Sequence, residues 1–195
     1  MYIYPCPEED RIIEQHYPIT VVQIGLSRIE EFTRFIFGVF ARQIARRQGW
    51  EPTEADLNTL LEEEFRLAPH GVYNGFCLPD GSIIGGIRSI KWHPDVVFPS
   101  ERIFGVNTVE MAKERKINLK RLWHSSQMGI DNETLRMSKH GKQVHRLVSR
   151  LMTLHSIRAM NDMGADYWIY ESDPTVVRRL ELLGIHSQTH TGLRD

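Results

Sequence analysis

The stretch that decides the fold is Arg121-Leu-Trp-His-Ser-Ser-Gln-Met-Gly-Ile-Asp131. Its residues 122–130 predict a largely apolar strand that crosses a core and carries a polar run at 124–127. A polar loop over 131–139, a long amphipathic helix over 140–163, a second strand over 166–171 and a short helix follow. Strand, helix, strand and helix in this order predict a βαβα unit with parallel strands and a right-handed crossover. Ligands of such units bind where the strands separate and where the helix begins, so we place the functional site there.

The composition is that of an ordinary globular protein. Hydrophobic residues make up 41% of the 195 residues and charged residues 25%, which is typical of a folded domain. We therefore expect a single α+β domain over residues 1–195, in which residues 1–18 form an N-terminal arm. The net charge of −1 provides no general attraction to nucleic acid, and we expect no nucleic-acid partner.

The cysteines and the N-terminus indicate in which cellular compartment the protein is expected. Cys6 and Cys77 are far apart and lack metal-ligand spacing, which favours a reducing environment. The first residues have neither the basic nor the apolar segment of a signal peptide, and no apolar run approaches the ~20 residues that span a bilayer. We expect a cytoplasmic protein without a transmembrane segment.

The first part of the chain predicts a strand and two helices. Residues 19–24 are β-branched and form the strand, and Ser27 and Glu30 are spaced as a capping box before the first helix, which ends at Gly49-Trp50. The second helix opens at Pro52-Thr53. Three consecutive carboxylates of this second helix are predicted to face solvent, namely Glu62, Glu63 and Glu64.

A hairpin comes next. Residues 72–78 and 82–92 flank Pro79-Asp80-Gly81, a strong turn signal. Gly85-Gly86 in the second strand indicates a bulge or a close approach by another part of the molecule. We expect a loop over 93–104 and a short helix over 107–116, so that the whole chain forms a mixed central sheet flanked by helices.

This order of elements is similar to the GNAT (acyl-CoA N-acyltransferase) fold. Within that superfamily, the chain most resembles the branch of acyl-homoserine-lactone synthases (autoinducer synthases) and long-chain N-acyl amino acid synthases. The resemblance covers residues 28–185. It is carried by Arg47-Gln-Gly-Trp50, the hairpin from Tyr73 to Arg88 with its Gly-x-x-Arg end, Leu122-Trp-His-Ser-Ser-Gln-Met128, Arg136, and Val176-Val-Arg-Arg-Leu-Glu-Leu-Leu-Gly-Ile185.

The resemblance implies an N-acyltransferase that moves a fatty-acyl group from acyl carrier protein or acyl-CoA to a small amine, such as an amino acid. The thioester would be a co-substrate, and no cofactor would be bound permanently. A short-chain acetyl-CoA N-acetyltransferase is the alternative enzyme. A non-catalytic module that binds an acyl ligand or a partner is the alternative of another class, because Leu180 stands where many GNATs have a catalytic tyrosine and His124 where the lactone synthases have a glutamate.

Acyl transfer needs a base that takes a proton from the amine. His124 is the first candidate, since an imidazole titrates near neutral pH, and a buried structural histidine is the alternative explanation. Glu171, at the end of the next strand, is the competing base. Arg88 in an apolar strand requires a carboxylate partner, which is either structural or the carboxylate of a substrate. The other predicted substrate-binding residues are Arg47, Trp50 and Gln127.

The acyl donor would be held by main-chain N–H groups and by the start of the long helix. We expect Met128, Gly129 and Ile130 to supply an oxyanion hole where the strands separate, although Gly129 is equally typical of a bulge. A helix N-terminus attracts phosphate, and a solvated turn is the alternative explanation for the residues there. The residues expected near the phosphates are Arg136, Lys139, Gly141 and Lys142.

Two further residue sets concern metals and partners. His186 with His190, and His145 with His155, have helical or loop spacings but no third ligand close in sequence, so no metal site is predicted. A basic cluster could steer an acidic acyl carrier protein toward the chain, or could simply face solvent. It consists of Lys113, Arg115, Lys116, Lys120 and Arg121.

Overall fold

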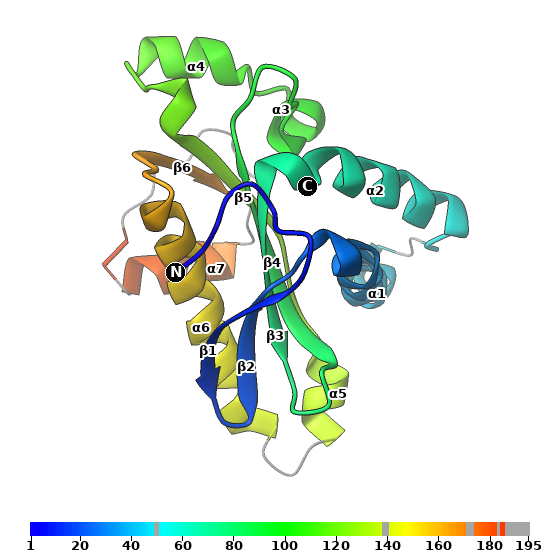
Figure 1. The fold of residues 1–195 in the computed structure, drawn as a ribbon. Coiled ribbons are helices and arrows are strands. Elements are labelled where there is room, and N and C mark those ends of the chain that lie inside the picture. Colours follow the sequence, from blue (N-terminus) through cyan, green and yellow to red (C-terminus); the bar gives the residue numbers. More distant parts are fainter. Residues whose placement is uncertain (49–50, 138–140, 171–173, 183, 186–195) are drawn as a thin grey trace.

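The computed structural model describes residues 1–48, 51–137, 141–170, 174–182 and 184–185. Its centre is a six-stranded sheet in which the strands lie side by side in chain order (Figure 1). The first five strands run antiparallel to their neighbours, and the last two are parallel. The strands are β1 (Arg11–His16), β2 (Ile19–Gln23), β3 (Gly71–Cys77), β4 (Ile83–Lys91), β5 (Leu122–Ile130) and β6 (Tyr167–Tyr170).

Helices cover both faces of this sheet. Figure 1 shows α1 and α2 on one side and α6 on the other, with the core between each helix layer and the strands. The helices are α1 (Ile29–Gln48), α2 (Glu54–Leu67), α3 (Pro99–Phe104), α4 (Thr108–Glu114), α5 (Asn132–Met137), α6 (Gly141–Asp162) and α7 (Pro174–Leu182). Among the described helices, none is both long and apolar enough to cross a bilayer.

The glycine pair of β4 lets the two helix layers approach the strand. A Cβ atom on Gly85 would lie 2.7 Å from Val148 Cγ1 of α6, and one on Gly86 would lie 2.6 Å from Phe32 Cε2 of α1. Real Cβ atoms do not approach other atoms so closely, so neither position admits a side chain without movement. The predicted close approach is therefore confirmed, and its partners are the two helices.

Three segments predicted as arm or loop contain regular structure. The predicted arm includes β1, which among the described residues is an edge strand paired with β2 alone. The residues of β1 are too polar to give a clear alternation. The predicted loop over 131–139 contains α5, because the Asp131 carboxylate accepts hydrogen bonds from the main-chain N–H groups of Glu133 and Thr134. The predicted loop over 93–104 contains α3, which begins at Pro99.

The predicted capping box is also placed differently. The hydroxyl of Ser27 donates to the Glu9 carboxylate at 3.1 Å and lies in a short 3₁₀ turn (Leu26–Arg28) that precedes α1. A capping box occurs instead at the start of α2, where the side chains of Thr53 and Asp56 bond to each other's main-chain N–H groups.

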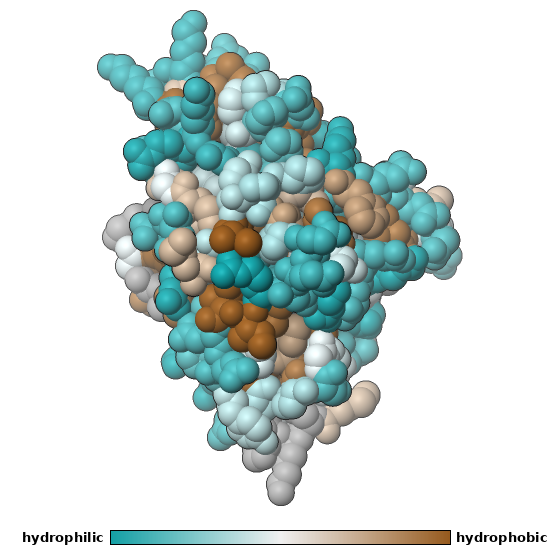
Figure 2. All heavy atoms as spheres, in the orientation of Figure 1, coloured by the Kyte–Doolittle hydropathy of each residue, from teal (hydrophilic) through white to brown (hydrophobic). Residues whose placement is uncertain are grey.

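The residues before β1 lie over the sheet as an arm. The main chain of Ile3 exchanges two hydrogen bonds with the Gln23 amide, at 3.1 and 2.6 Å, and the Tyr4 ring lies edge-on to Trp123. The Tyr2 hydroxyl lies 2.7 Å from Nδ1 of His155 on α6. Figure 2 shows this face as mostly hydrophilic, with apolar side chains gathered near its middle. The arm thus ties the N-terminus to both the sheet and α6.

We expect Gly86→Ala to lower the free energy of unfolding by about 1–3 kcal/mol, because the new methyl group collides with Phe32. Gly38→Ala in α1 is the matched control, since its Cβ would have only the end of Arg42 nearby, at 3.6 Å. The control should raise stability by up to about 1 kcal/mol through helix propensity. Urea unfolding of both variants measures the difference, and equal stabilities would contradict the packing described above.

Candidate active site

A β-bulge interrupts β5 in the middle of the sheet. Gly86 of β4 pairs with Gly129, whereas Arg88 pairs with Ser126, so one residue of β4 faces two residues of β5. The extra residue lies at Gln127–Met128, and Gln127 has a left-handed backbone with φ of 53°. Bulges of this kind bend a strand and redirect its main-chain groups, and they occur often next to active sites.

Beyond the bulge, one edge of β5 is open, in that no strand of the described part of the chain pairs with it. β6 pairs with β5 only from Leu122 to Ser125 among the described residues, at the end of β5 nearer to α4 (Figure 1). The N–H of Asp131 donates to Ile84 of β4, and main-chain groups alternate along a strand. The N–H groups of Met128 and Ile130 are therefore directed to the side away from β4, where no described residue of β6 pairs with them.

The residues of β5 that were predicted to bind the acyl donor thus differ in whether their N–H groups are available to a ligand. Met128 and Ile130 are partly buried, and their N–H groups point toward the open edge. Gly129 is buried, and a Cβ there would lie 3.2 Å from Val39 Cγ1 and 3.3 Å from Ile36 Cδ1. Gly129 accommodates α1, and the bulge lies beside it rather than at it.

A buried carboxylate network supports the bulge from the α2 side. Glu64 accepts hydrogen bonds from the Tyr73 hydroxyl at 2.9 Å and from the Gln127 amide at 2.7 Å, and it forms an ion pair with Arg88. The other terminal nitrogen of Arg88 donates to the Ser126 hydroxyl at 2.6 Å. The side chains of Glu64 and Arg88 are both fully buried. Residues of α2, β3, β4 and β5 therefore meet on one carboxylate.

Burial raises the pKa of Glu64 above its ordinary value. The positive charge of Arg88 and the hydrogen bonds from Tyr73 and Gln127 lower the pKa, but they do not cancel the effect of burial. The same burial, together with the charge of Glu64, raises the pKa of the Tyr73 phenol, which stays protonated as a donor.

The prediction that this glutamate run faces solvent is wrong for two of its members. Glu64 is fully buried and Glu63 is nearly so, with Glu63 lying 2.8 Å from Arg102. A signal was present in the sequence, because Glu64 lies seven residues after Leu57 and so shares its buried helix face. Arg88 in an apolar strand was a second signal, since it required a carboxylate partner.

The structure favours the structural alternative for Arg88. Its side chain is buried, and its two terminal nitrogens are engaged by Glu64 and Ser126. The guanidinium therefore holds the network together and does not present an open fork to a substrate carboxylate. Gln127, predicted to bind substrate, is half-buried and is oriented by Glu64.

His124 is fully buried, and its ring stacks on Phe98 with centroids 4.9 Å apart and planes 21° apart. This placement favours the alternative of a structural histidine over that of a base. Glu171, Trp50 and Lys139 lie outside the described residues, as does the side chain of Arg47, whose main chain belongs to α1.

The predicted phosphate-binding residues lie where α5 ends and α6 begins. Arg136 and Lys142 are exposed, Gly141 is the buried first residue of α6, and the first turn of α6 contains no acidic residue. The 22-residue α6 thus begins with the positive end of its dipole and an adjacent cation.

The basic cluster proposed for carrier-protein docking lies at the other end of β5, around α4 (Figure 1). Arg121 pairs with Asp166 at 2.8 Å and donates to the carbonyl of Gly164, and Arg115 donates to the Tyr167 hydroxyl. These two arginines connect β6 to the segment before β5.

Comparison with solved structures identifies the fold. A protein of Clostridium acetobutylicum, described as a predicted acetyltransferase and solved with acetyl-CoA, superposes with a TM-score of 0.58 at 8% identity, covering 91% of this chain and 96% of its own. The protein AAC(6')-Iy, solved with the bisubstrate analogue CoA-S-monomethyl-acetylneamine, gives a TM-score of 0.50 at 14% identity, covering 93% of this chain and 98% of its own. No protein-family model and no curated protein sequence matches the chain. The predicted GNAT fold is therefore confirmed by structure alone.

We expect Glu64→Gln to destabilise the protein by about 3–5 kcal/mol, because it leaves the buried charge of Arg88 unpaired. The double variant Glu64→Leu with Arg88→Met removes both charges and should recover most of this loss. Thermal and urea unfolding of the single and double variants form the test. A double variant less stable than the single one would contradict the pairing.

Proposed function

We propose that this protein transfers an acyl group from an acyl-CoA thioester to the amine of a small molecule. The amine nitrogen attacks the thioester carbonyl, the C–S bond breaks, and CoA leaves as a thiolate that takes up a proton. Attack would occur directly in a ternary complex. Both cysteines are buried, and burial raises the pKa of the Cys6 thiol to about 12 and that of Cys77 to about 11, so neither suits a covalent relay.

The observation that carries this proposal is the open edge of β5 beyond its bulge. The N–H groups of Met128 and Ile130 are directed toward a space that β6 does not fill among the described residues. An extended pantetheine arm that entered there could accept hydrogen bonds from these N–H groups, much as an added strand would. A thioester carbonyl at the bulge would acquire negative charge during attack, and a fixed N–H group would stabilise it.

The start of α6 supports the phosphate end of the same ligand. The dipole of the helix and the cations Arg136 and Lys142 favour an anion next to the end of β5. The basic cluster around α4 lies at the opposite end of the strand, where it would not meet these phosphates (Figure 1). This arrangement supports CoA over an acyl carrier protein as the donor.

We propose Glu171 as the base, because it directly follows Tyr170, whose pairing with Ser125 is the last pair described between β5 and β6. We expect Glu171→Gln to lower kcat by about 10²-fold or more and to alter the acid limb of the pH profile. His124→Gln should lower the melting temperature while the pH profile keeps its shape, since His124 packs against Phe98. The opposite pattern would restore His124 as the base.

One direct assay identifies both the acyl group that is transferred and the amine that accepts it. The purified protein is incubated with thioesters from acetyl-CoA to palmitoyl-CoA, with an acyl carrier protein thioester, and with a panel of amino acids and other amines. Mass spectrometry identifies the amide product, and a thiol reagent measures released CoA. A fatty-acyl product would support the branch that the sequence resembles, and an acetyl product the alternative enzyme. No product from any pair would support the non-catalytic module.

Met128→Pro tests the open edge. Proline removes the N–H of Met128, which is not part of the ladder with β4, and Met128→Leu is the control that keeps it. We expect kcat to fall about 10²–10³-fold in the proline variant and little in the control. Circular dichroism and thermal unfolding establish that both variants are folded. Equal activity of two folded variants would count against this N–H group as a donor.

A further inference from the structure

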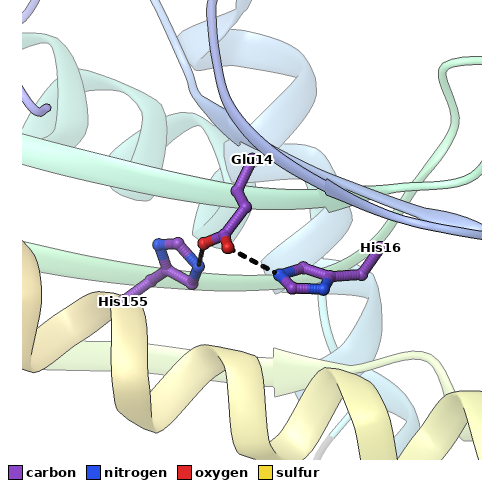
Figure 3. A group of neighbouring side chains, drawn as sticks. All are labelled: Glu14, His16 and His155. Carbon is purple, nitrogen blue, oxygen red and sulfur yellow. Dashed lines mark ion pairs between the residues drawn. The ribbon is translucent and has the colours of Figure 1, made fainter.

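A second cluster of reactive side chains lies between the edge strand β1 and α6, on the side of the sheet opposite to α1. Glu14 and His16 are two residues apart on β1, so their side chains point to the same side, and His155 reaches them from α6 (Figure 3). One ligand atom from each of the three lies within 4.8 Å of the others. These atoms are an oxygen and two imidazole nitrogens, the ligands that zinc-class metals prefer.

The two imidazoles approach the carboxylate closely without forming good hydrogen bonds. Nε2 of His16 lies 3.1 Å from Oε1 of Glu14, and Nε2 of His155 lies 3.2 Å from Oε2. Both nitrogens are buried atoms that lack a hydrogen-bond partner in the described part of the chain. Two ligands bound at 2.0–2.1 Å to a tetrahedral ion are about 3.3 Å apart, and each nitrogen lies at about this distance from one of the two Glu14 oxygens.

His155 is held in the orientation that a ligand requires. Its side chain is fully buried, and Nδ1 lies 2.7 Å from the Tyr2 hydroxyl, which leaves Nε2 directed toward Glu14. A partner on the second ring nitrogen fixes the orientation of metal-binding histidines. Burial, followed by the charge of Arg158, lowers the pKa of His155 and favours the neutral imidazole.

We propose that Glu14, His16 and His155 form a binding site for a divalent transition-metal ion of the zinc class. Glu14 and His16 are 35% and 36% exposed, so a fourth coordination position would face solvent and be filled by water. The ion would clamp β1 to α6, next to the point where the arm contacts α6 through Tyr2. This site is separate from the proposed acyl-transfer site at the bulge of β5.

The effect of removing Arg158 distinguishes a metal site from a simple ion-pair cluster. Its Nη1 lies 2.8 Å from Oε2 of Glu14, and its side chain is 51% exposed and can turn into solvent. In the absence of metal, Arg158 neutralises Glu14. A bound cation would compete with Arg158 for the same carboxylate, so removing the arginine should strengthen metal binding, whereas it could only weaken an ion-pair cluster.

The test is Zn²⁺ binding to the full-length protein, measured by calorimetry, with Co²⁺ absorption as a report on tetrahedral nitrogen and oxygen ligation. We expect one site in the wild type, affinity at least about tenfold weaker in both His16→Gln and Glu14→Gln, and affinity up to about fivefold tighter in Arg158→Gln. His93→Gln is the matched control, since His93 is a half-exposed histidine that also pairs with a carboxylate, Asp95, and lies outside this cluster.

Thermal unfolding without metal shows whether each variant is folded, and Zn²⁺ should raise the melting temperature of the wild type more than that of His16→Gln. The proposal is overturned if the wild type does not bind Zn²⁺, if His16→Gln and Glu14→Gln bind as tightly as the wild type, or if His93→Gln weakens binding as much as they do. An Arg158→Gln variant that binds more weakly would also overturn it.

Discussion

The ion pair between Glu64 and Arg88 is the constraint on which the candidate active site depends. Two buried charges are tolerated only because each is paired and further hydrogen-bonded, and the Tyr73, Ser126 and Gln127 side chains supply those bonds. The bond to Gln127 fixes the residue with the left-handed backbone. A network that runs from α2 through three strands thus holds the bulge of β5 in place.

The pairing of β5 differs on the two sides of the bulge. Before it, β5 is paired on both sides. After it, β5 keeps only its antiparallel neighbour among the described residues. The glycines at 85 and 86 of β4 and at 129 of β5 let α1 and α6 pack closely on the same region of the sheet. Main-chain donors held in place by such packing would suit a thioester, because they require little reorganisation as charge develops.

The sequence predicted the βαβα unit and the hairpin, since these rest on periodicity and turn residues that act locally. The GNAT fold was predicted from the resemblance of the element order and motifs to that superfamily. The sequence did not predict β1 or α5, whose stabilisation comes from pairing with β2 and from a single aspartate cap. It predicted main-chain donors at Met128, Gly129 and Ile130, which stays a prediction. It missed the burial of Glu64, because a run of three glutamates suggested a solvated face. It considered His155 only with His145, since Glu14 and His16 meet His155 through the fold alone.

The central claim is that the main chain at Met128 and Ile130 receives the acyl donor. Amide chemical shifts of the ¹⁵N-labelled protein, titrated with a non-hydrolysable thioether analogue of acyl-CoA, test it most directly. We predict that the amides of these two residues shift more than those of their neighbours paired with β4, such as Gly129. Shifts confined to another part of the sheet, or no shifts at saturating analogue, would contradict the account.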